Sequence, residues 1–208
     1  MLTVALTGGI ASGKSIVGDV LRRRGCHIDK SDEVAREIMA PGRPAWTKIV
    51  ARFGQDLLKS DRSIDRKKLG AIIFGDADAR RFIDALIHPL VMKKKRKTIA
   101  RLDQEGRVKI YVSEAALTIE AGFAEFFDEV VVVYCPEEVQ VRRLMDRDAI
   151  GCEEACRRIR TQMPAEEKLE YADYVVDTSG SMEETIEQAE ELYEELLLAG
   201  RIKSGSAG

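Results

Sequence analysis

Cysteine is scarce in this chain, and the few cysteines follow no common metal-binding or disulfide pattern. The 208 residues include four, with no C-x-x-C spacing and no histidine cluster nearby: Cys26, Cys135, Cys152 and Cys156. This argues against a structural zinc site and against a disulfide framework. We therefore expect free thiols in a reducing compartment, and so a cytoplasmic protein.

Excess positive charge and long apolar runs are missing as well. The formal net charge is −3 and the isoelectric point is about 5.6, so no overall basic field predicts a nucleic-acid partner. No apolar run approaches the roughly 20 residues that span a bilayer. The opening MLTVALTGG lacks the charged flank of a signal peptide. We expect neither nucleic acid nor membrane as a partner, and a chain of 208 residues can bury one core with a smaller lobe.

A glycine-rich segment near the N-terminus is the clearest functional pattern. Residues 8–15, GGIASGKS, fit G-x-x-x-x-G-K-[ST] and lie between a short apolar run and an amphipathic helical pattern. In such a loop the glycines let backbone N–H groups face phosphate oxygens, the lysine reaches the β- and γ-phosphates, and the serine hydroxyl ligates Mg²⁺. The pattern predicts a metal ligand in Ser15 and ATP contacts from Gly8, Gly9, Ala11, Ser12, Gly13, Lys14, Ser15 and Ile16.

Strand and helix patterns alternate at both ends of the chain, and the middle is helical. Five segments have strand composition: residues 2–6, 26–28, 107–114, 129–135 and 171–177. Between residues 44 and 106 only helices are indicated, the last of them bent or broken near Pro89. The final helix should end at Gly200, with residues 201–208 disordered. This order predicts an α/β fold, a parallel five-stranded sheet flanked by helices and carrying an inserted helical lobe.

A phosphate loop alone does not choose among nucleotide-binding proteins. The chain lacks an N-K-x-D motif and is short for a remodelling ATPase, which leaves phosphoryl transfer to a small acceptor. Such transfer needs mobile arginines that offset charge. Arg143 and Arg147 share one predicted helical face, at the start of a charged stretch of about residues 142–170 that Pro164 interrupts. We interpret this stretch as a lid, the alternative being a solvated basic face.

Two aspartates compete for the role of the carboxylate that holds the acceptor. Asp29 and Asp32 lie in HIDKSDEVAR, residues 27–36, where the second predicted strand gives way to a helix. Asp29 fits the N-cap of that helix, and Asp32 fits its third position, where an acid complements the helix dipole. The local pattern by itself leaves the catalytic role of either aspartate open.

Several segments together resemble the dephospho-CoA kinase family. The resemblance covers about residues 3–197 and depends on ALTGGIASGKS, SDEVAREIMAPG, RFG, IDRKKLGAIIF, IHPLV, RRLMDRD and QMPAEEKLEYADYVVDTSGS. The TGGI form of the loop, the HPL and the QMP…EK…ADYV run are specific to that family. The resemblance implies ATP- and Mg²⁺-dependent phosphorylation of the ribose 3′-hydroxyl of dephospho-CoA, the last step of coenzyme A synthesis.

The resemblance also implies how the chain is divided. Residues 1–42 and 107–200 should form a P-loop NTPase-type nucleotide-binding core, with the lid within about 142–170. Residues 43–106 should form the helical lobe that binds the CoA part of the acceptor. ATP and dephospho-CoA are the expected partners, and we expect a monomer or a weak homo-oligomer.

Roles for individual residues follow from the same resemblance. It favours Asp32 as a catalytic residue, together with Lys14, Arg143 and Arg147. Contacts with the acceptor are expected from Thr7, Asp32, Arg36, His88 and Glu120.

The chain departs from the family pattern in two places. Where the family has D-A-D, this sequence reads Lys30-Ser31-Asp32. Where the family has P-L-L-x-E, residues 115–122 read AALTIEAG and lack the proline. Both departures fall on the acceptor side of the expected site.

Some residues keep an ordinary structural alternative beside the functional one. His88 could cap a helix end or pack, and Arg36 could pair with Asp32 instead of the acceptor. Glu114 or Glu120 could support Mg²⁺ or be surface charge, and the basic run at residues 93–97 suits a solvated helix face. Two other functions also stay open: a nucleoside or nucleotide monophosphate kinase, and a nucleotide-binding switch without transfer activity.

Overall fold

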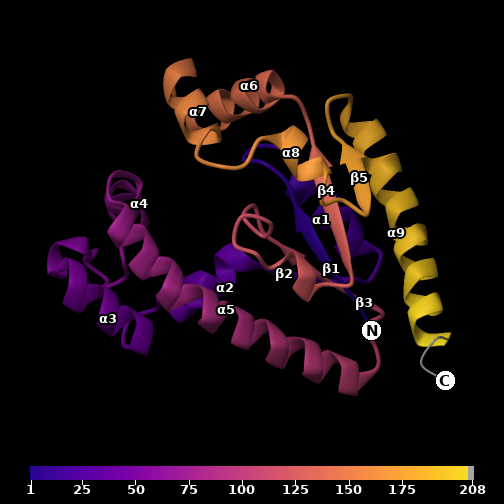
Figure 1. Cartoon of the computed structure of the whole chain (residues 1–208), viewed down its shortest axis with the longest axis horizontal. Coiled ribbons are helices and arrows are strands. Elements are labelled where there is room, and N and C mark those ends of the chain that lie inside the picture. Colours follow the sequence, from indigo (N-terminus) through magenta and orange to yellow (C-terminus); the bar gives the residue numbers. More distant parts are fainter. Residues whose placement is uncertain (206–208) are drawn as a thin grey trace. The chain divides into compact units, whose positions relative to one another are not determined.

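The protein is built around a five-stranded parallel sheet (Figure 1). The computed structural model describes residues 1–205, and its strands run in the order β2-β3-β1-β4-β5 with every neighbouring pair parallel. The strands are β1 Leu2–Thr7, β2 His27–Lys30, β3 Ile110–Glu114, β4 Glu129–Tyr134 and β5 Tyr174–Asp177. The predicted parallel five-stranded sheet flanked by helices is confirmed.

Helices follow the strands and fill the middle of the chain. They are α1 Lys14–Arg23, α2 Ser31–Ile38, α3 Pro44–Phe53, α4 Arg66–Gly75, α5 Ala77–Glu105, α6 Glu137–Asp148, α7 Cys152–Ile159, α8 Ala165–Leu169 and α9 Met182–Gly205, with 3₁₀ turns η1 Gln55–Leu57 and η2 Ala124–Phe126. Among the described residues, none of these helices has the length and apolar character needed to cross a membrane.

The main core lies where α1 and α9 pack together with the sheet. Val17, Val20 and Leu21 of α1 are buried against Val4 and Val112 of the strands. The apolar stripe of α9 completes this cluster with Ile186, Ala189, Leu192, Tyr193 and Leu196. Burial of these stripes fixes α1, and with it the loop that precedes α1, on the central strand β1.

The chain forms two compact units. The core unit comprises Met1–Lys30 and the described residues from Leu102 onward, and the helical unit comprises Ser31–Arg101. The sequence predicted a lobe at residues 43–106, so the helical unit begins earlier. The reason is that Ala35, Ile38 and Met39, from α2 and the turn after it, pack into the apolar cluster around Ile49 of α3.

Asp29 belongs to a strand and does not cap a helix. It lies in β2, in register with Ser113 of β3, and the pairing continues to Lys30 opposite Glu114. Because the chain stays extended through Lys30, α2 begins only at Ser31. The predicted N-cap role of Asp29 is therefore wrong, and Asp32 is the second residue of the helix instead of its third.

The two longest helices run further than their sequences indicate. α5 continues through Pro89 without a break, and Leu90 and Val91, which follow the proline, pack with Ile87 in the core of the helical unit. Continuing the helix therefore buries apolar side chains on both sides of the missing N–H. α9 continues past Gly200 to Gly205, and Lys203 pairs with Asp128 at 2.6 Å. The helix predicted to be bent or broken near Pro89 is not broken there, and the predicted end at Gly200 is wrong. Residues 206–208 of the predicted tail lie outside the described residues.

Candidate active site

The glycine-rich loop joins the end of β1 to the start of α1. Gly8 has a φ of 148°, and a Cβ at this position would lie 2.3 Å from the carbonyl oxygen of Val133. Gly13 has a φ of 90° and forms the N-cap of α1. A larger residue would clash at the first position and be strained at the second. The backbone therefore curls tightly, and the N-terminus of α1 opens onto the loop as in sites that bind phosphate.

Lys14 folds back onto the loop. Its Nζ donates to the carbonyl oxygens of Gly8 at 2.9 Å and Gly9 at 2.7 Å. These bonds hold a positive charge over the loop while no phosphate is present. A triphosphate would have to compete with the two carbonyls for the ammonium group, which can swing because its stem is flexible.

Ser12 carries a buried hydroxyl at the centre of the loop. Its residue is 0% exposed, and in the described structure the Oγ has no hydrogen-bond partner. That Oγ lies 2.8 Å from the place that a Cβ of Gly8 would occupy. Burying a hydroxyl without a partner is costly, so Ser12 is a donor available to a ligand inside the loop.

The glycine-rich loop and its surroundings offer only a few protein ligands for Mg²⁺. Ser15 is exposed in the first turn of α1. Glu114 Oε2 lies 3.0 Å from the ideal Cβ position of Gly18, one turn further along the same helix. Across residues 1–205 there is no group of three His, Cys, Asp or Glu side chains that could hold a metal ion. Mg²⁺ usually keeps waters and shares substrate phosphates, so a serine hydroxyl with one nearby carboxylate suits it.

Arg143 is linked to the loop through Thr178, which follows β5. Its guanidinium donates to Thr178 Oγ1 at 3.0 Å and to the Thr178 carbonyl at 2.5 Å. The Thr178 hydroxyl donates in turn to the Ser12 carbonyl at 2.8 Å, and its side chain lies 3.4 Å from an ideal Cβ of Gly13. One intervening side chain therefore separates Arg143 from the loop, a link that the sequence did not indicate.

Arg147 has different surroundings from Arg143. Its side chain is 56% exposed and pairs with Asp148 at 2.8 Å. Asp148 also accepts from Arg158 of α7 at 3.0 Å. The hydrogen bond from Arg147 holds the pKa of Asp148 below its usual range. The two arginines predicted to act together thus share a helix, but only Arg143 is connected to the loop here.

Helices α6 and α7, from the segment predicted to form a lid, lie side by side (Figure 1). Leu144, Ala155 and Ile159 form a small buried cluster between them. Ile10 and Ala11 from the tip of the glycine-rich loop pack against this cluster. The predicted lid segment therefore contacts the loop directly, as a segment that excludes water from bound phosphates would have to do.

Thr7 and Glu120 are both occupied within the core unit. The hydroxyl of Thr7 donates to the carbonyl of Ala116 at 3.3 Å. Glu120 accepts from the backbone N–H of Met163 at 3.1 Å and from Lys168 Nζ at 2.7 Å. Both side chains, which were predicted to contact the acceptor, thus have partners within the protein. The role of Lys168, which is fully buried, was missed although the QMP…EK run marked the segment.

The other predicted acceptor contacts belong to the helical unit. Asp32 and Arg36 are exposed on successive turns of α2. His88 lies inside α5, with its Nε2 3.6 Å from Asp84 Oδ1, so it does not cap a helix end. In the basic run at residues 93–97 most side chains reach solvent, but Lys95 is buried.

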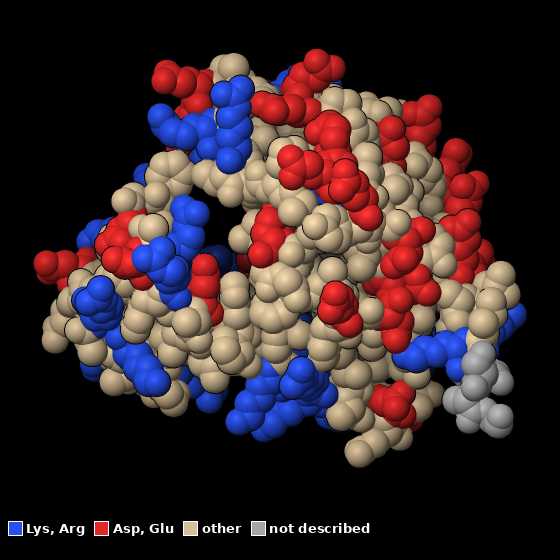
Figure 2. Space-filling view, in the orientation of Figure 1, with Lys and Arg blue, Asp and Glu red and all other residues tan. Residues whose placement is uncertain are grey.

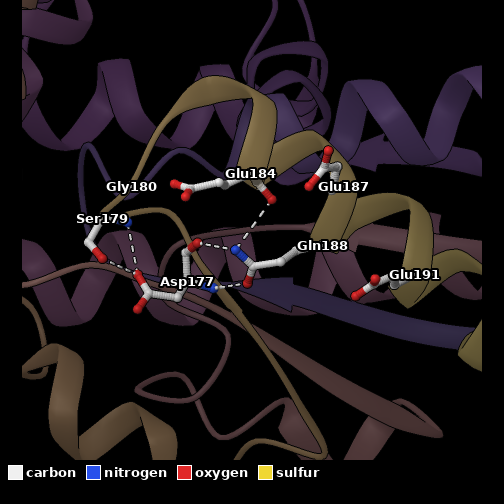
Figure 3. Close-up of a pocket in the computed structure, with 7 residues that line it drawn as sticks. All are labelled: Asp177, Ser179, Gly180, Glu184, Glu187, Gln188 and Glu191. Atoms are coloured by element: carbon white, nitrogen blue, oxygen red, sulfur yellow. Dashed lines mark hydrogen bonds between the residues drawn. The ribbon is translucent and has the colours of Figure 1, made fainter.

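A separate pocket lies beside the C-terminal end of β5 (Figure 3). It is lined by Asp177, Ser179, Gly180, Glu184, Glu187, Gln188 and Glu191. Gln188 bridges the strand end and α9, since its amide bonds both the N–H and the carbonyl of Asp177. Acidic side chains also gather over the α9 side of the molecule (Figure 2). This concentration of carboxylates repels phosphates, so the pocket does not suit a nucleotide, whereas the curled backbone of the glycine-rich loop does.

Comparisons with known proteins agree on one family. The pattern of the dephospho-CoA kinase family matches residues 2–184. A dephospho-CoA kinase of Carboxydothermus hydrogenoformans is 45% identical over 185 residues, which are 89% of this chain and 89% of that one. A dephospho-CoA kinase of Geobacter sulfurreducens is 45% identical over 193 residues, 93% of this chain and 98% of the relative.

Solved structures are similar as well. The dephospho-CoA kinase from Campylobacter jejuni has a TM-score of 0.70 and 28% identity, covering 95% of this chain and 98% of that one. TT1252 from Thermus thermophilus reaches a TM-score of 0.78 at 28% identity, covering 92% and 95%. A shikimate kinase from Acinetobacter baumannii, with a TM-score of 0.54 and 18% identity over 96% of this chain and 94% of that one, shares the fold.

Proposed function

The chain belongs to the dephospho-CoA kinase family, and on this basis we propose that it transfers the γ-phosphoryl group of ATP to the ribose 3′-hydroxyl of dephospho-CoA. The observation that carries the proposal is a phosphate loop packed against lid helices, one of which contributes an arginine linked to that loop. Phosphoryl transfer depends mainly on positioning and on stabilising charge, and this arrangement supplies both.

On the ATP side, the loop amides and the dipole of α1 hold the phosphates. Lys14 leaves the carbonyls of Gly8 and Gly9 and reaches the β- and γ-phosphates. Arg143 and Arg147 offset charge that develops as the γ-phosphoryl group moves. The buried hydroxyl of Ser12 donates to a phosphate oxygen, which satisfies a group that otherwise has no partner in the described structure.

Mg²⁺ is the proposed cofactor. When bound, it would neutralise the negative charge of the phosphates during transfer. Ser15 would hold it through its hydroxyl, and Glu114 stands near enough to α1 to order a water in its shell.

On the acceptor side, Asp32 holds the 3′-hydroxyl and takes its proton. Arg36, one turn further along α2, attracts the anionic acceptor, and His88 is a further contact on α5. The helical unit, Ser31–Arg101, binds the CoA part. Lys30 replaces the first aspartate of the family pattern, and its place at the end of β2 opposite Glu114 offers it a carboxylate neighbour. Cytoplasmic location and a monomer or weak homo-oligomer stay predictions.

The test is a comparison of acceptors. Purified protein with ATP and Mg²⁺ should phosphorylate dephospho-CoA, detected by mass spectrometry of the product, and should leave AMP and nucleosides unmodified. The Lys14→Met variant should fail to do so because its loop lacks the mobile charge. Turnover of a nucleoside but not of dephospho-CoA would assign another kinase activity. ATP binding without transfer to any acceptor would indicate a switch.

A further inference from the structure

The segment that leads back from the lid, residues 161–170, is fastened to the phosphate loop by a side chain. We call it the return segment. It contains α8 and follows α7 directly. Within it, Gln162 Oε1 accepts the backbone N–H of Ile10 at 2.8 Å. Ile10 lies at the tip of the glycine-rich loop, so this bond fixes the direction of one loop amide from outside the loop.

A buried ion pair holds the return segment in place. The side chain of Lys168 is 0% exposed, and its Nζ donates to Glu120 Oε1 at 2.7 Å and to the Ala116 carbonyl at 2.8 Å. Glu120 also accepts the N–H of Met163, next to Gln162, at 3.1 Å. A buried ammonium is costly unless it is paired and hydrogen-bonded, so removing either partner should loosen the segment strongly.

The Ala116 carbonyl also connects Lys168 to the start of the loop. The Ala116 carbonyl that receives Lys168 also accepts the hydroxyl of Thr7 at 3.3 Å. Thr7 is fully buried and is the last residue of β1, directly before the loop. Both the entrance and the tip of the loop are therefore tied to one short segment, although neither tie involves an atom expected to touch ATP.

We propose that Gln162 and Lys168 are positioning residues that hold the phosphate loop in the shape that receives ATP. Gln162 orients the loop tip through Ile10, and Lys168 keeps Gln162 in place through Glu120 and Ala116. These positioning roles extend the proposed function, and they depend on one part of it, which is that the loop binds ATP. Pre-arranged donors act strongly because they need no reorganisation when the ligand arrives. In this arrangement Glu120 serves the ATP side of the site, although the sequence assigned it to the acceptor.

The experiment compares three variants with the parent protein. Gln162→Met removes the acceptor oxygen and keeps the length of the side chain. Lys168→Met removes the buried charge and keeps the stem. Glu167→Gln is the matched control, because Glu167 is exposed on α8 and its side chain forms no hydrogen bond or ion pair with the loop in the described part of the chain. Binding of ADP with Mg²⁺ is measured by calorimetry at 25 °C, together with steady-state kinetics and thermal unfolding.

Gln162→Met should weaken ADP binding by about fivefold to tenfold, as expected for one lost hydrogen bond. The KM for ATP should rise by a similar factor, while the KM for dephospho-CoA stays within about twofold. Lys168→Met should change ADP binding in the same direction by about tenfold or more, with a lower melting temperature. Glu167→Gln should match the parent in every measurement.

Two results would overturn the proposal. If folded Gln162→Met bound ADP within about twofold of the parent, the bond to Ile10 would be structural only. If instead only the KM for dephospho-CoA rose, the segment would serve the acceptor. Gln162 is partly exposed, so its variant keeps the test valid even if Lys168→Met fails to fold. ADP binding needs no acceptor, so a wrong acceptor assignment cannot be mistaken for failure of this inference.

Discussion

Asp32 and Asp29 differ sharply in their surroundings although only three positions separate them. Asp32 is exposed in the first turn of α2, whereas Asp29 is 8% exposed within β2. Burial, and to a lesser extent the Asp29 carboxylate, raises the pKa of the neighbouring Tyr111 hydroxyl well above its usual range. An exposed carboxylate can meet a substrate, while a buried one mainly serves the packing of the sheet.

We predict that Asp32→Asn lowers kcat by about 10²-fold to 10⁴-fold, the usual contribution of a general base. The melting temperature should change little, because the side chain is exposed. Asp29→Asn is the matched control and should lower stability while kcat stays near that of the parent. Steady-state kinetics and thermal unfolding of both variants check this. The opposite pattern, with Asp29→Asn inactive and stable, would move the catalytic role to β2.

Cysteine reactivity is a second prediction at this scale. Burial raises the pKa of the Cys26 thiol to about 12, an effect that the nearby Arg24 only partly opposes. Cys26 is therefore a protonated, unreactive thiol at pH 8. Cys135 is buried too, whereas Cys152 is exposed at the start of α7.

Native protein treated with iodoacetamide at pH 8 should be modified first at Cys152. Cys26 and Cys135 should react only after unfolding in denaturant, because only the thiolate attacks. Mass spectrometry of peptides after timed quenching measures the order. Modification of Cys26 at the same rate as Cys152 would show that its surroundings open in the native state.

At the scale of elements, one short polar side chain joins α6 to the glycine-rich loop and to the end of β5. Thr178, in the turn after β5, receives Arg143 of α6 and donates to the Ser12 carbonyl in the loop. Three elements that are distant in sequence meet at this hydroxyl. A methyl group in its place keeps the shape of the side chain but removes the donor to the Ser12 carbonyl and one of the two acceptors of Arg143, which keeps its bond to the Thr178 carbonyl.

Thr178→Val should therefore raise the KM for ATP or lower kcat, with kcat/KM for ATP reduced about tenfold or more. Thr47→Val offers a control, since Thr47 is exposed on α3 and its hydroxyl bonds only its own helix at 3.3 Å. Steady-state kinetics at varied ATP concentrations give kcat/KM for both variants. Equal kcat/KM values for the two would mean that the Thr178 hydroxyl plays no part in catalysis.

At the scale of the whole molecule, the two compact units should respond to different ligands. The glycine-rich loop, the predicted lid and α9 belong to the core unit, while α2, α3, α4 and α5 as far as Arg101 form the helical unit. Each unit has its own apolar cluster, so each can gain stability separately when a ligand binds to it.

Hydrogen exchange measured by mass spectrometry tests this division. ADP with Mg²⁺ should protect amides of the core unit, chiefly around residues 8–16 and in α7, and leave residues 31–101 almost unchanged. Dephospho-CoA should add protection in the helical unit, since the proposed CoA contacts lie there. Uniform protection by ADP along the whole chain would contradict two separately responding units.

The sequence by itself determined the elements whose cause is local. Apolar segments of strand composition, alternating with helical patterns, predicted the five parallel strands. The spacing of glycines, lysine and serine in residues 8–15 predicted a phosphate loop, because such a loop needs those residues whatever surrounds it. Motif resemblance predicted the family. Local pattern failed where distant packing decided the outcome, as at Gly200 and Asp29.

Only the tertiary structure decided which side chains meet. Strand pairing of β2 with β3 placed Asp29 inside the sheet, and packing of α2 on α3 moved the boundary of the helical unit to Ser31. Contacts between Gln162 and Ile10, between Lys168 and Glu120, and between Arg143 and Thr178 join residues separated by 35 to 152 positions. No periodicity or spacing along the chain can specify such pairs, because they form only when the sheet brings the ends of its strands to one edge.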